Sequence, residues 1–323
     1  MDRIEPAHHA FRVQSAIASG EAVKSPVVAS WRRSSLLHRL DPAEGTLPQR
    51  LTGSELRRAR ERAAPLVRAS QAAMDRLSQA VGMVGCCVLL ADSDGVPVDR
   101  RGAMADDAAF QSWGLWTGAI WSEASEGTNG IGTCLVEQRA LTIDRDQHFL
   151  GRNTEMSCTA APIYDHNAQL AGVLDVSSCR ADSTYPFTKL IAIAVNEAVR
   201  RIEAEMFRSA FTGTGIRIQL TPPVEGGFGG LVAIDADDLI IGATKCARTW
   251  LGIVSEGSVQ PVPATDLFFG PYAECEHLGD AERRTLQRTL LRSHGNVSAA
   301  AKALGVSRAT LHRKLKRLRV KPH

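Results

Sequence analysis

The C-terminal end of the chain carries a pattern that restricts its fold and its binding partners together. Leucines recur at helical spacing from residue 311 to 318, and Gly305 and Ser307 before them are typical of a tight turn and a helix N-cap. An alanine-rich run before the glycine predicts another short helix with Ser298 as its N-cap, and residues 281–293 predict a third. Two short helices around a glycine turn are typical of a helix-turn-helix, whose second helix enters the DNA major groove.

Positive charge is concentrated in the same segment. Residues 281–323 contain twelve Lys or Arg and one acid, a net charge of +11, and because the whole chain carries +3 the remainder carries −8. This asymmetry predicts a polyanion-binding module joined to a part that does not bind polyanions. The alternative is that the basic residues only cover the solvated face of a helical bundle. The predicted DNA-binding residues are Ser298, Ser307, Arg308, Ala309, Thr310, His312, Arg313, Lys314, Lys316 and Arg317.

The segment also resembles the C-terminal domain of the Fis family, which many bacterial enhancer-binding activators carry at their end. Its most specific part is "SRATLHRKLKRL". The resemblance implies a homodimeric module that reads a palindromic operator in double-stranded DNA, with half-sites about one helical turn (~34 Å) apart.

The middle of the chain has a different pattern. Residues 54–81 predict one long amphipathic helix, and residues 186–206 predict another whose buried stripe includes Leu190. Between them, "CCVLLADSDGVPVDRR" predicts a strand, a turn and a strand, and further strands are predicted at 141–143 and on both sides of 165–168. Thr128 is the predicted cap of a helix that ends near residue 138. Helices that flank an antiparallel sheet predict an α+β sensor-type domain.

A series of motifs in this region resembles a GAF domain of the acetoin-regulator type. The motifs are Trp121-Ser122-Glu123, Gly127–Thr133, Gln147-His148-Phe149, Ala160–Ile163 and Gly172–Asp175, and "SWRRSSLLHRLDP" upstream is similar to the N-terminal signature of those regulators. The resemblance implies a regulatory domain that holds a small-molecule effector on one side of its sheet and passes the change on through flanking helices. The predicted ligand-binding residues are Trp121, Glu123, Thr128, Asn129, His148 and Asp175.

Two interpretations stay open for several of these residues. The run "GTNGIGT" either binds phosphate or carboxylate through backbone N–H groups or forms a structural loop that closes the pocket. It is not a P-loop, because no Lys follows it. His148 is either a ligand contact or a loop histidine satisfied by the protein. The tryptophans at 113, 116 and 121 line a pocket or pack in the core.

A segment between the two modules predicts a strand, an Asp-rich turn, a strand and a helix from about Ala243. It resembles the core of the PAS-like segment that lies between the GAF and ATPase domains of the same regulators, but it is short for a complete domain. The predicted domains are therefore an N-terminal helical region (1–53), a GAF sensor domain (54–208), a partial PAS-like segment with linker (209–279) and an all-α Fis-type helix-turn-helix (280–323).

These features predict a cytoplasmic, ligand-responsive transcription regulator that binds specific DNA sequences and is not an enzyme. No G-x-x-x-x-G-K-[ST] motif occurs, and "AFTG" at 210–213 resembles a sigma-factor contact loop without the ATPase domain in which that loop works. We therefore expect no ATPase activity, and either repression or recruitment of RNA polymerase by contact. No membrane span, metal site or cofactor is expected, because the chain has no long apolar run and its seven cysteines form no C-x-x-C pair.

Two alternatives come from other classes of protein. The first is a GAF-type thiol enzyme that reduces methionine sulfoxide, with Cys134 or Cys158 as nucleophile, although no nearby His is evident to lower the pKa of either thiol. The second is an architectural DNA-binding dimer whose GAF domain holds no ligand.

Overall fold

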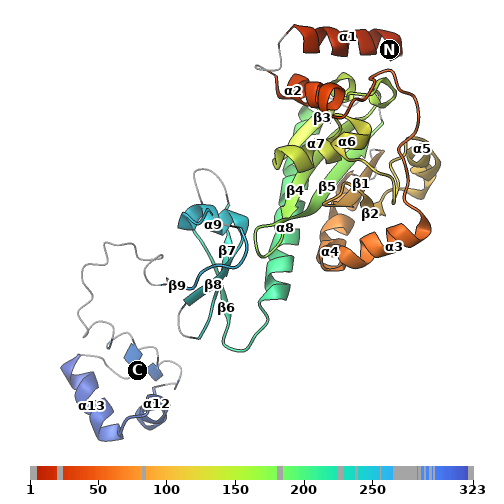
Figure 1. Ribbon diagram of the computed structural model, residues 1–323. Helices are drawn as coiled ribbons and strands as arrows, with labels where there is room; N and C mark the ends of the chain where they lie inside the picture. The colour runs from red at the N-terminus through yellow and green to blue at the C-terminus, as the bar shows by residue number, and fades with distance from the viewer. Residues whose placement is uncertain are drawn as a thin grey trace. The chain divides into compact units, whose positions relative to one another are not determined.

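The computed structural model describes two units, Met1–Pro261 and Val262–His323 (Figure 1). The described residues are 6–19, 25–81, 85–179, 185–223, 228–236, 239–254, 256–264, 282, 285–286, 289–290, 293 and 295–318. Each unit has a hydrophobic core of its own.

A five-stranded antiparallel sheet forms the centre of the first unit, with strand order β2-β1-β5-β4-β3. Its strands are β1 (Cys86–Asp92), β2 (Pro97–Arg101), β3 (Leu141–Asp144), β4 (Ser157–Tyr164) and β5 (Leu170–Ser178). In the β1–β2 turn, the Asp92 carboxylate accepts hydrogen bonds from the N–H groups of Asp94 and Val96, each at 3.0 Å. The predicted sheet and its hairpins are confirmed.

Two helices, α4 (Ala64–Val81) and α8 (Tyr185–Ala210), cover one face of this sheet. The prediction of a single helix over 54–81 is wrong, because α3 (Gly53–Arg62) ends before α4 begins. Pro65 explains the break: it has no N–H to donate, and its ring would conflict with the carbonyl four residues earlier. A capping box between Thr52 and Glu55 starts α3.

The predicted stripe of α8 is correct except at Leu190. Ile191, Val195 and Ile202 are buried against the sheet, whereas Leu190 is 64% exposed and Ile193 is 65% exposed. Residue 190 precedes Ile191 by one position, which rotates its side chain by about 100° on a helix. Together, Leu190 and Ile193 leave an apolar strip on the outer side of α8.

The opposite face of the sheet is covered by three short helices, and it contains the predicted ligand-binding residues. These helices are α5 (Asp107–Ser112), α6 (Glu123–Glu126) and α7 (Gly130–Glu137), with one-turn 3-10 helices at Met104–Asp106, Arg145–Gln147 and Gly151–Asn153. The predicted cap Thr128 is wrong by one residue: the Asn129 side chain accepts the hydrogen bond from Gly132 N at 2.8 Å.

The N-terminal helices α1 (Pro6–Ala18) and α2 (Pro26–Arg32), with a π-helical turn at Arg33–Leu37, lie beside α6, α7 and β3 (Figure 1). Val13, Val28 and Trp31 pack against Phe149 and Leu150. Trp31 Nε1 also donates to the carbonyl of Gln147 at 2.8 Å. The segment that resembles the regulator signature is therefore packed onto the loop that follows β3.

A smaller antiparallel sheet follows α8 within the first unit, built from β6 (Arg217–Leu220), β7 (Leu231–Ile234) and β8 (Leu239–Ala243). Helix α9 (Lys245–Leu251) begins two residues after the predicted start, with Thr244 as N-cap. The Phe211 ring fills the space above Gly242, and its centroid lies 4.7 Å from that of the Phe207 ring, with the two planes tilted by 46°. Phe211 of the "AFTG" run is thus a packing residue here.

The second unit begins with the short strand β9 (Val262–Pro263) and contains α12 (Val297–Ala303) and α13 (Arg308–Arg317). In the predicted helix 281–293, residues 282, 285–286 and 289–290 are helical, and the others except 293 lie outside the described residues. A small core joins the three segments: Leu286, Leu290, Ala300, Ala301, Leu311 and Leu315.

The predicted N-cap is correct for α13 and wrong for α12. Ser307 caps α13 as predicted, accepting from Thr310 N at 3.0 Å, and Gly305 has the positive φ (64°) that the turn requires. The predicted cap Ser298 is wrong. Asn296 caps α12, because its carboxamide oxygen lies 3.0 Å from Ser298 N and 3.1 Å from Ala299 N.

Candidate ligand site and DNA-binding surface

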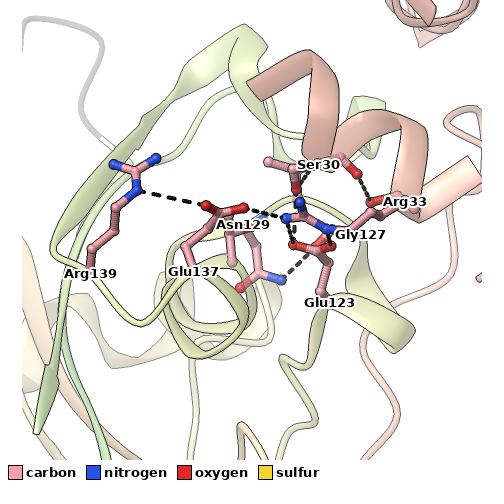
Figure 2. A network of polar contacts seen from close by, with 10 residues as sticks. Ser30, Arg33, Glu123, Gly127, Asn129, Glu137 and Arg139 are labelled. Atoms are coloured by element: carbon pink, nitrogen blue, oxygen red, sulfur yellow. Dashed lines mark hydrogen bonds and ion pairs between the residues drawn. The ribbon is translucent and has the colours of Figure 1, made fainter. Parts of the chain in front are cut away.

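A buried carboxylate, Glu123, lies at the centre of a polar network between the N-terminal segment and α6 (Figure 2). It accepts hydrogen bonds from Arg33 Nε at 2.7 Å and Nη2 at 3.2 Å, and from the Ser30 hydroxyl at 2.9 Å. The Arg33 guanidinium also reaches Glu137 at 2.7 Å. The Glu123 side chain is only 1% exposed, whereas that of Arg33 is 30% exposed. Glu123 therefore depends on Arg33 for its charge compensation.

The predicted ligand-binding residues next to this network also have hydrogen-bond partners within the protein. The Thr128 hydroxyl lies 2.7 Å from that of Ser30, the Asn129 amide donates to Gly127 O at 2.8 Å, and Trp121 Nε1 donates to Gly114 O at 3.0 Å. All six predicted ligand-binding residues are at most 2% exposed. Trp121, Glu123, Thr128 and Asn129 thus form one group around the start of α7, on the same side of the sheet as His148 and Asp175.

His148 and Asp175 are joined through Cys158, which the sequence offered only as a candidate nucleophile, and Ser177, which sequence reasoning missed. His148 Nε2 lies 3.5 Å from Cys158 Sγ, Cys158 Sγ lies 3.2 Å from Ser177 Oγ, and Ser177 Oγ lies 2.5 Å from Asp175 Oδ2. Burial lowers the pKa of His148 to about 4, so its ring is neutral near neutral pH. Its Nδ1–H donates to Arg145 O at 2.9 Å, which leaves Nε2 as an acceptor for the Cys158 thiol.

This geometry corrects one expectation about the thiols. A histidine does lie beside Cys158, contrary to what the sequence indicated. The ring cannot supply an imidazolium, however, and burial raises the pKa of both the Cys158 and the Cys134 thiols. The Cys134 thiol donates to Arg139 O at 3.4 Å.

The glycines of "GTNGIGT" are explained by close packing. A Cβ on Gly130 would lie 2.6 Å from Cys158 Cβ and 2.7 Å from Asp175 Oδ1, and one on Gly132 would lie 2.6 Å from Trp121 O. Gly127 has φ +63° and lies against the Phe149 ring. These contacts favour the structural-loop interpretation of the run, while they place the start of α7 directly over Asp175.

Asp175 gives a prediction about pH and stability. Its carboxyl is fully buried, and burial raises its pKa to about 7 in spite of the opposing hydrogen bond from Ser177. The folded state therefore keeps a proton that the unfolded state loses above about pH 4, so this residue's contribution to stability falls as pH rises through about 4 to 7. The free energy of unfolding of Asp175→Asn, relative to the wild type, is expected to rise across that window by at most about 1.4 kcal/mol per pH unit.

Urea unfolding of both proteins at several pH values across this window measures the effect. A difference between the two proteins that stays constant over the window would contradict the assignment of a titrating buried carboxyl to Asp175.

The second candidate site is the outer surface of α13. Ala309, His312, Arg313 and Lys316 are exposed and lie opposite the buried Leu311 and Leu315 on the helix. Among the residues that the structure describes, the Arg313 side chain has one weak polar contact, 3.5 Å to the Thr310 hydroxyl. This face carries two cations and a histidine, all three among the residues predicted to bind DNA.

Other predicted DNA-binding residues have partners within their own unit. Lys314 and Arg317 form ion pairs with Glu282, and the hydroxyls of Ser307 and Thr310 lie 2.8 Å apart in the cap of α13. Arg308 and Ser298 are exposed. The structure therefore separates a free face, centred on Arg313, from residues that also hold the fold together.

The two sites define a class: a sensor-type α+β domain and a DNA-binding helix-turn-helix in one chain. Residues 65–203 match the GAF domain, and residues 277–318 match the bacterial regulatory protein domain of the Fis family. The chain therefore contains a GAF domain and a Fis-family helix-turn-helix.

Similar proteins of named function are transcriptional regulators. The chain is 32% identical over 224 residues to the acetoin catabolism regulatory protein of Cupriavidus necator, covering 69% of this chain and 34% of that protein. It is 27% identical to the acetoin dehydrogenase operon transcriptional activator of Bacillus subtilis, over 58% of this chain and 31% of that one. It is 29% identical to the propane 2-monooxygenase operon activator of Mycolicibacterium smegmatis, over 53% of this chain and 28% of that one. The chain spans about a third of the length of these relatives.

A solved structure shares the fold. The Escherichia coli DhaR(N)–DhaL complex contains a chain that aligns with a TM-score of 0.52 at 16% identity, over 72% of this chain and 79% of that one. Among the helices of the described residues, none has the length and apolar character that crossing a membrane requires. Within the same residues, no group of three or more His, Cys, Asp or Glu side chains is placed to hold a metal ion.

Proposed function

We propose that this protein is a ligand-responsive transcription regulator, in which the GAF domain binds a small-molecule effector and the C-terminal helix-turn-helix binds a specific operator. The observation that carries the proposal is the free basic face of α13, presented opposite a compact leucine core and joined in one chain to a GAF domain. The relatives named as operon activators support it.

Further parts of the proposal concern the assembly. A homodimer is supported by the exposed apolar strip of Leu190 and Ile193 on α8, since a pair of such helices would cover it. A dimer would present two recognition helices to a palindromic operator. The proposal also includes either repression or recruitment of RNA polymerase by contact, and the relatives named as operon activators support the second of these.

The thiol-enzyme alternative has little support from the site. A nucleophilic cysteine needs a lowered pKa and access to its substrate. Cys134 and Cys158 are buried, and burial raises the pKa of both thiols. We therefore propose that neither thiol performs catalysis and that the domain acts by binding.

The proposal is tested by selecting genomic duplexes with the full chain and then measuring binding to the selected and the scrambled duplex by fluorescence anisotropy. We expect a clear preference for the selected sequence at moderate ionic strength. Equal affinity for both duplexes would overturn the assignment of a sequence-specific regulator.

One substitution probes the face of α13 directly. Arg313→Ala is expected to weaken operator binding roughly tenfold, and to reduce the slope of log affinity against log salt by about 0.9 for each phosphate that the variant no longer neutralises. The matched control is Arg57→Ala, which removes the same charge from α3 in the other unit. Should the Arg313 variant match this control in both affinity and slope, Arg313 is not in the interface.

A further inference from the structure

A cleft lies along α4 and α8, the two helices on the face of the GAF sheet opposite the predicted effector site. Its volume is about 650 Å³, and it is bounded by α4, by the C-terminal half of α8 and by Phe228 and Gly229 before β7. Sites for small molecules commonly have volumes of about 300–1,000 Å³. Neither the sequence motifs nor the proposed function accounts for this cleft.

The two helices run antiparallel along the cleft. Helix α4 ends shortly before β1 begins, and α8 begins shortly after β5 ends. Because Cys86 of β1 pairs with Ser178 of β5, these two helix ends lie at the same end of the sheet. Arg68 near the start of α4 therefore lies towards Arg208 near the end of α8. Arg76 lies eight residues further along α4, at a distance of about 12 Å.

Positive charge is concentrated in this cleft. Its charged lining residues are Arg68, Arg76, Arg200, Arg201, Arg208, Glu197 and Glu205. Five arginines and two glutamates give the lining a net charge of +3, whereas residues 1–280 as a whole carry −8. The cleft therefore has the opposite sign to the part of the chain in which it lies, and it attracts anions.

Only two of the five arginines are compensated by the protein. The Glu197 carboxylate pairs with Arg200 at 2.7 Å and with Arg201 at 3.0 Å. Within the described part of the chain, three exposed arginines form no hydrogen bond or ion pair: Arg68, Arg76 and Arg208. Each guanidinium presents a planar fork of N–H donors that matches the oxygens of a phosphate. The unpaired donors lie at the two ends of the cleft.

The surface between these ends is small and apolar. It is lined by four alanines: Ala69, Ala72, Ala73 and Ala204. The Phe228 ring forms one wall and is 57% exposed. The Arg200 guanidinium carbon lies 3.5 Å from the centroid of this ring, so a cation–π contact holds the wall against α8. A short organic skeleton fits along such a surface.

We propose that this cleft binds an organic anion with two phosphate groups on a short skeleton, as a second ligand site separate from the effector site. Arg76 donates to one phosphate, Arg68 and Arg208 donate to the other, and the skeleton lies along the alanines. Two phosphate esters carry a charge of about −3 to −4 near neutral pH, which matches the +3 of the lining. One phosphate ester would compensate only about half of it.

Charge also argues against a second copy of the chain in this cleft. The partner would place its own arginines against the same surface, and like charges repel when they are brought together. The dimer contact proposed for Leu190 and Ile193 uses the N-terminal half of α8, whereas the cleft uses residues 197–208.

Isothermal titration calorimetry of the full chain tests the ligand class with matched probes. Fructose 1,6-bisphosphate and ribulose 1,5-bisphosphate carry two phosphates, and fructose 6-phosphate and ribulose 5-phosphate each keep one of them. We expect at least one bisphosphate to bind about tenfold or more tightly than its monophosphate, because the monophosphate leaves the arginines at one end unpaired. Citrate, which offers carboxylates on a short skeleton, should bind more weakly than that bisphosphate.

Substitutions then locate the site. Arg76→Gln and Arg68→Gln should each weaken binding of the bisphosphate by about tenfold, and Arg76→Gln should also reduce its advantage over the monophosphate. Arg57→Gln is the matched control, since it removes the same charge from the exposed surface of α3. Arg313→Gln tests the basic face of α13 as the site instead, and it should leave the bisphosphate affinity unchanged. Circular dichroism verifies that each variant is folded, and Arg208→Gln provides a further test of the Arg68 end.

Four outcomes overturn the inference. They are that neither bisphosphate binds, that the monophosphate or citrate binds as tightly as the bisphosphate, that the cleft variants bind like the Arg57 control, or that Arg313→Gln loses as much affinity as the cleft variants do. Operator preference is measured separately on the same preparation, so each of these outcomes rejects the second ligand site and leaves the proposed regulator standing.

Discussion

Replacing Arg33 with alanine is expected to lower the free energy of unfolding of the first unit by about 3 kcal/mol. The substitution removes two hydrogen bonds and the compensating charge from Glu123, whose side chain is 1% exposed. Ser30 then remains as the hydrogen-bond donor to a buried carboxylate. The cost arises because a buried charge that loses its partner is far less stable than the same charge in water.

Tryptophan fluorescence during urea unfolding reports this change, because all five tryptophans lie in the first unit. The control is Arg139→Ala, since Arg139 lies 3.7 Å from Glu137 and is half exposed, and such surface pairs contribute about 0–1 kcal/mol. Combining Arg33→Ala with Glu123→Gln should recover part of the loss by removing the uncompensated charge. If Arg33→Ala is no more destabilising than Arg139→Ala, Glu123 does not depend on Arg33.

The second large effect is expected in the helix-turn-helix. Leu311→Ala should abolish specific DNA binding by unfolding the second unit, while the tryptophan transition of the first unit stays unchanged. Leu311 is fully buried between Leu286, Ala300 and Leu315. Truncating a buried leucine costs about 2–5 kcal/mol, and a core this small has little stability to lose.

Far-ultraviolet circular dichroism and anisotropy with the operator duplex measure the two consequences. The control is Lys302→Ala on the exposed surface of α12, which should retain helix content. Unchanged operator affinity in Leu311→Ala would show that this leucine core is not what holds α13 in place.

The two predictions concern contacts of different origin. In the helix-turn-helix, the packing partners are close in sequence, so leucine spacing, the Gly305 turn and the Ser307 cap indicated the fold directly. In the sensor domain, Arg33 and Glu123 are ninety residues apart. The "SWRR" run resembles the N-terminal signature of the regulators. The spacing of its residues, however, gives no information about which carboxylate Arg33 contacts.

Local errors in the sequence predictions also have physical causes. Asn129 and Asn296, rather than Thr128 and Ser298, cap their helices. Asn, Thr and Ser are all good caps, so the residue that forms the cap depends on the backbone geometry at the helix start. Apolar periodicity alone predicted one continuous helix through Pro65. In the structure α3 ends before this proline, because its missing N–H outweighs the apolar stripe that continues into α4.

The sequence by itself determined the α+β sensor fold, the helix-turn-helix and the basic face of α13, because these depend on local periodicity, turn residues and charge. Only the tertiary structure placed Arg33 on Glu123 and linked His148 to Asp175 through Cys158 and Ser177. Each of these contacts joins separate strands or helices. Strand order and register decide which side chains meet across a sheet, and neither is written in the spacing of residues along the chain.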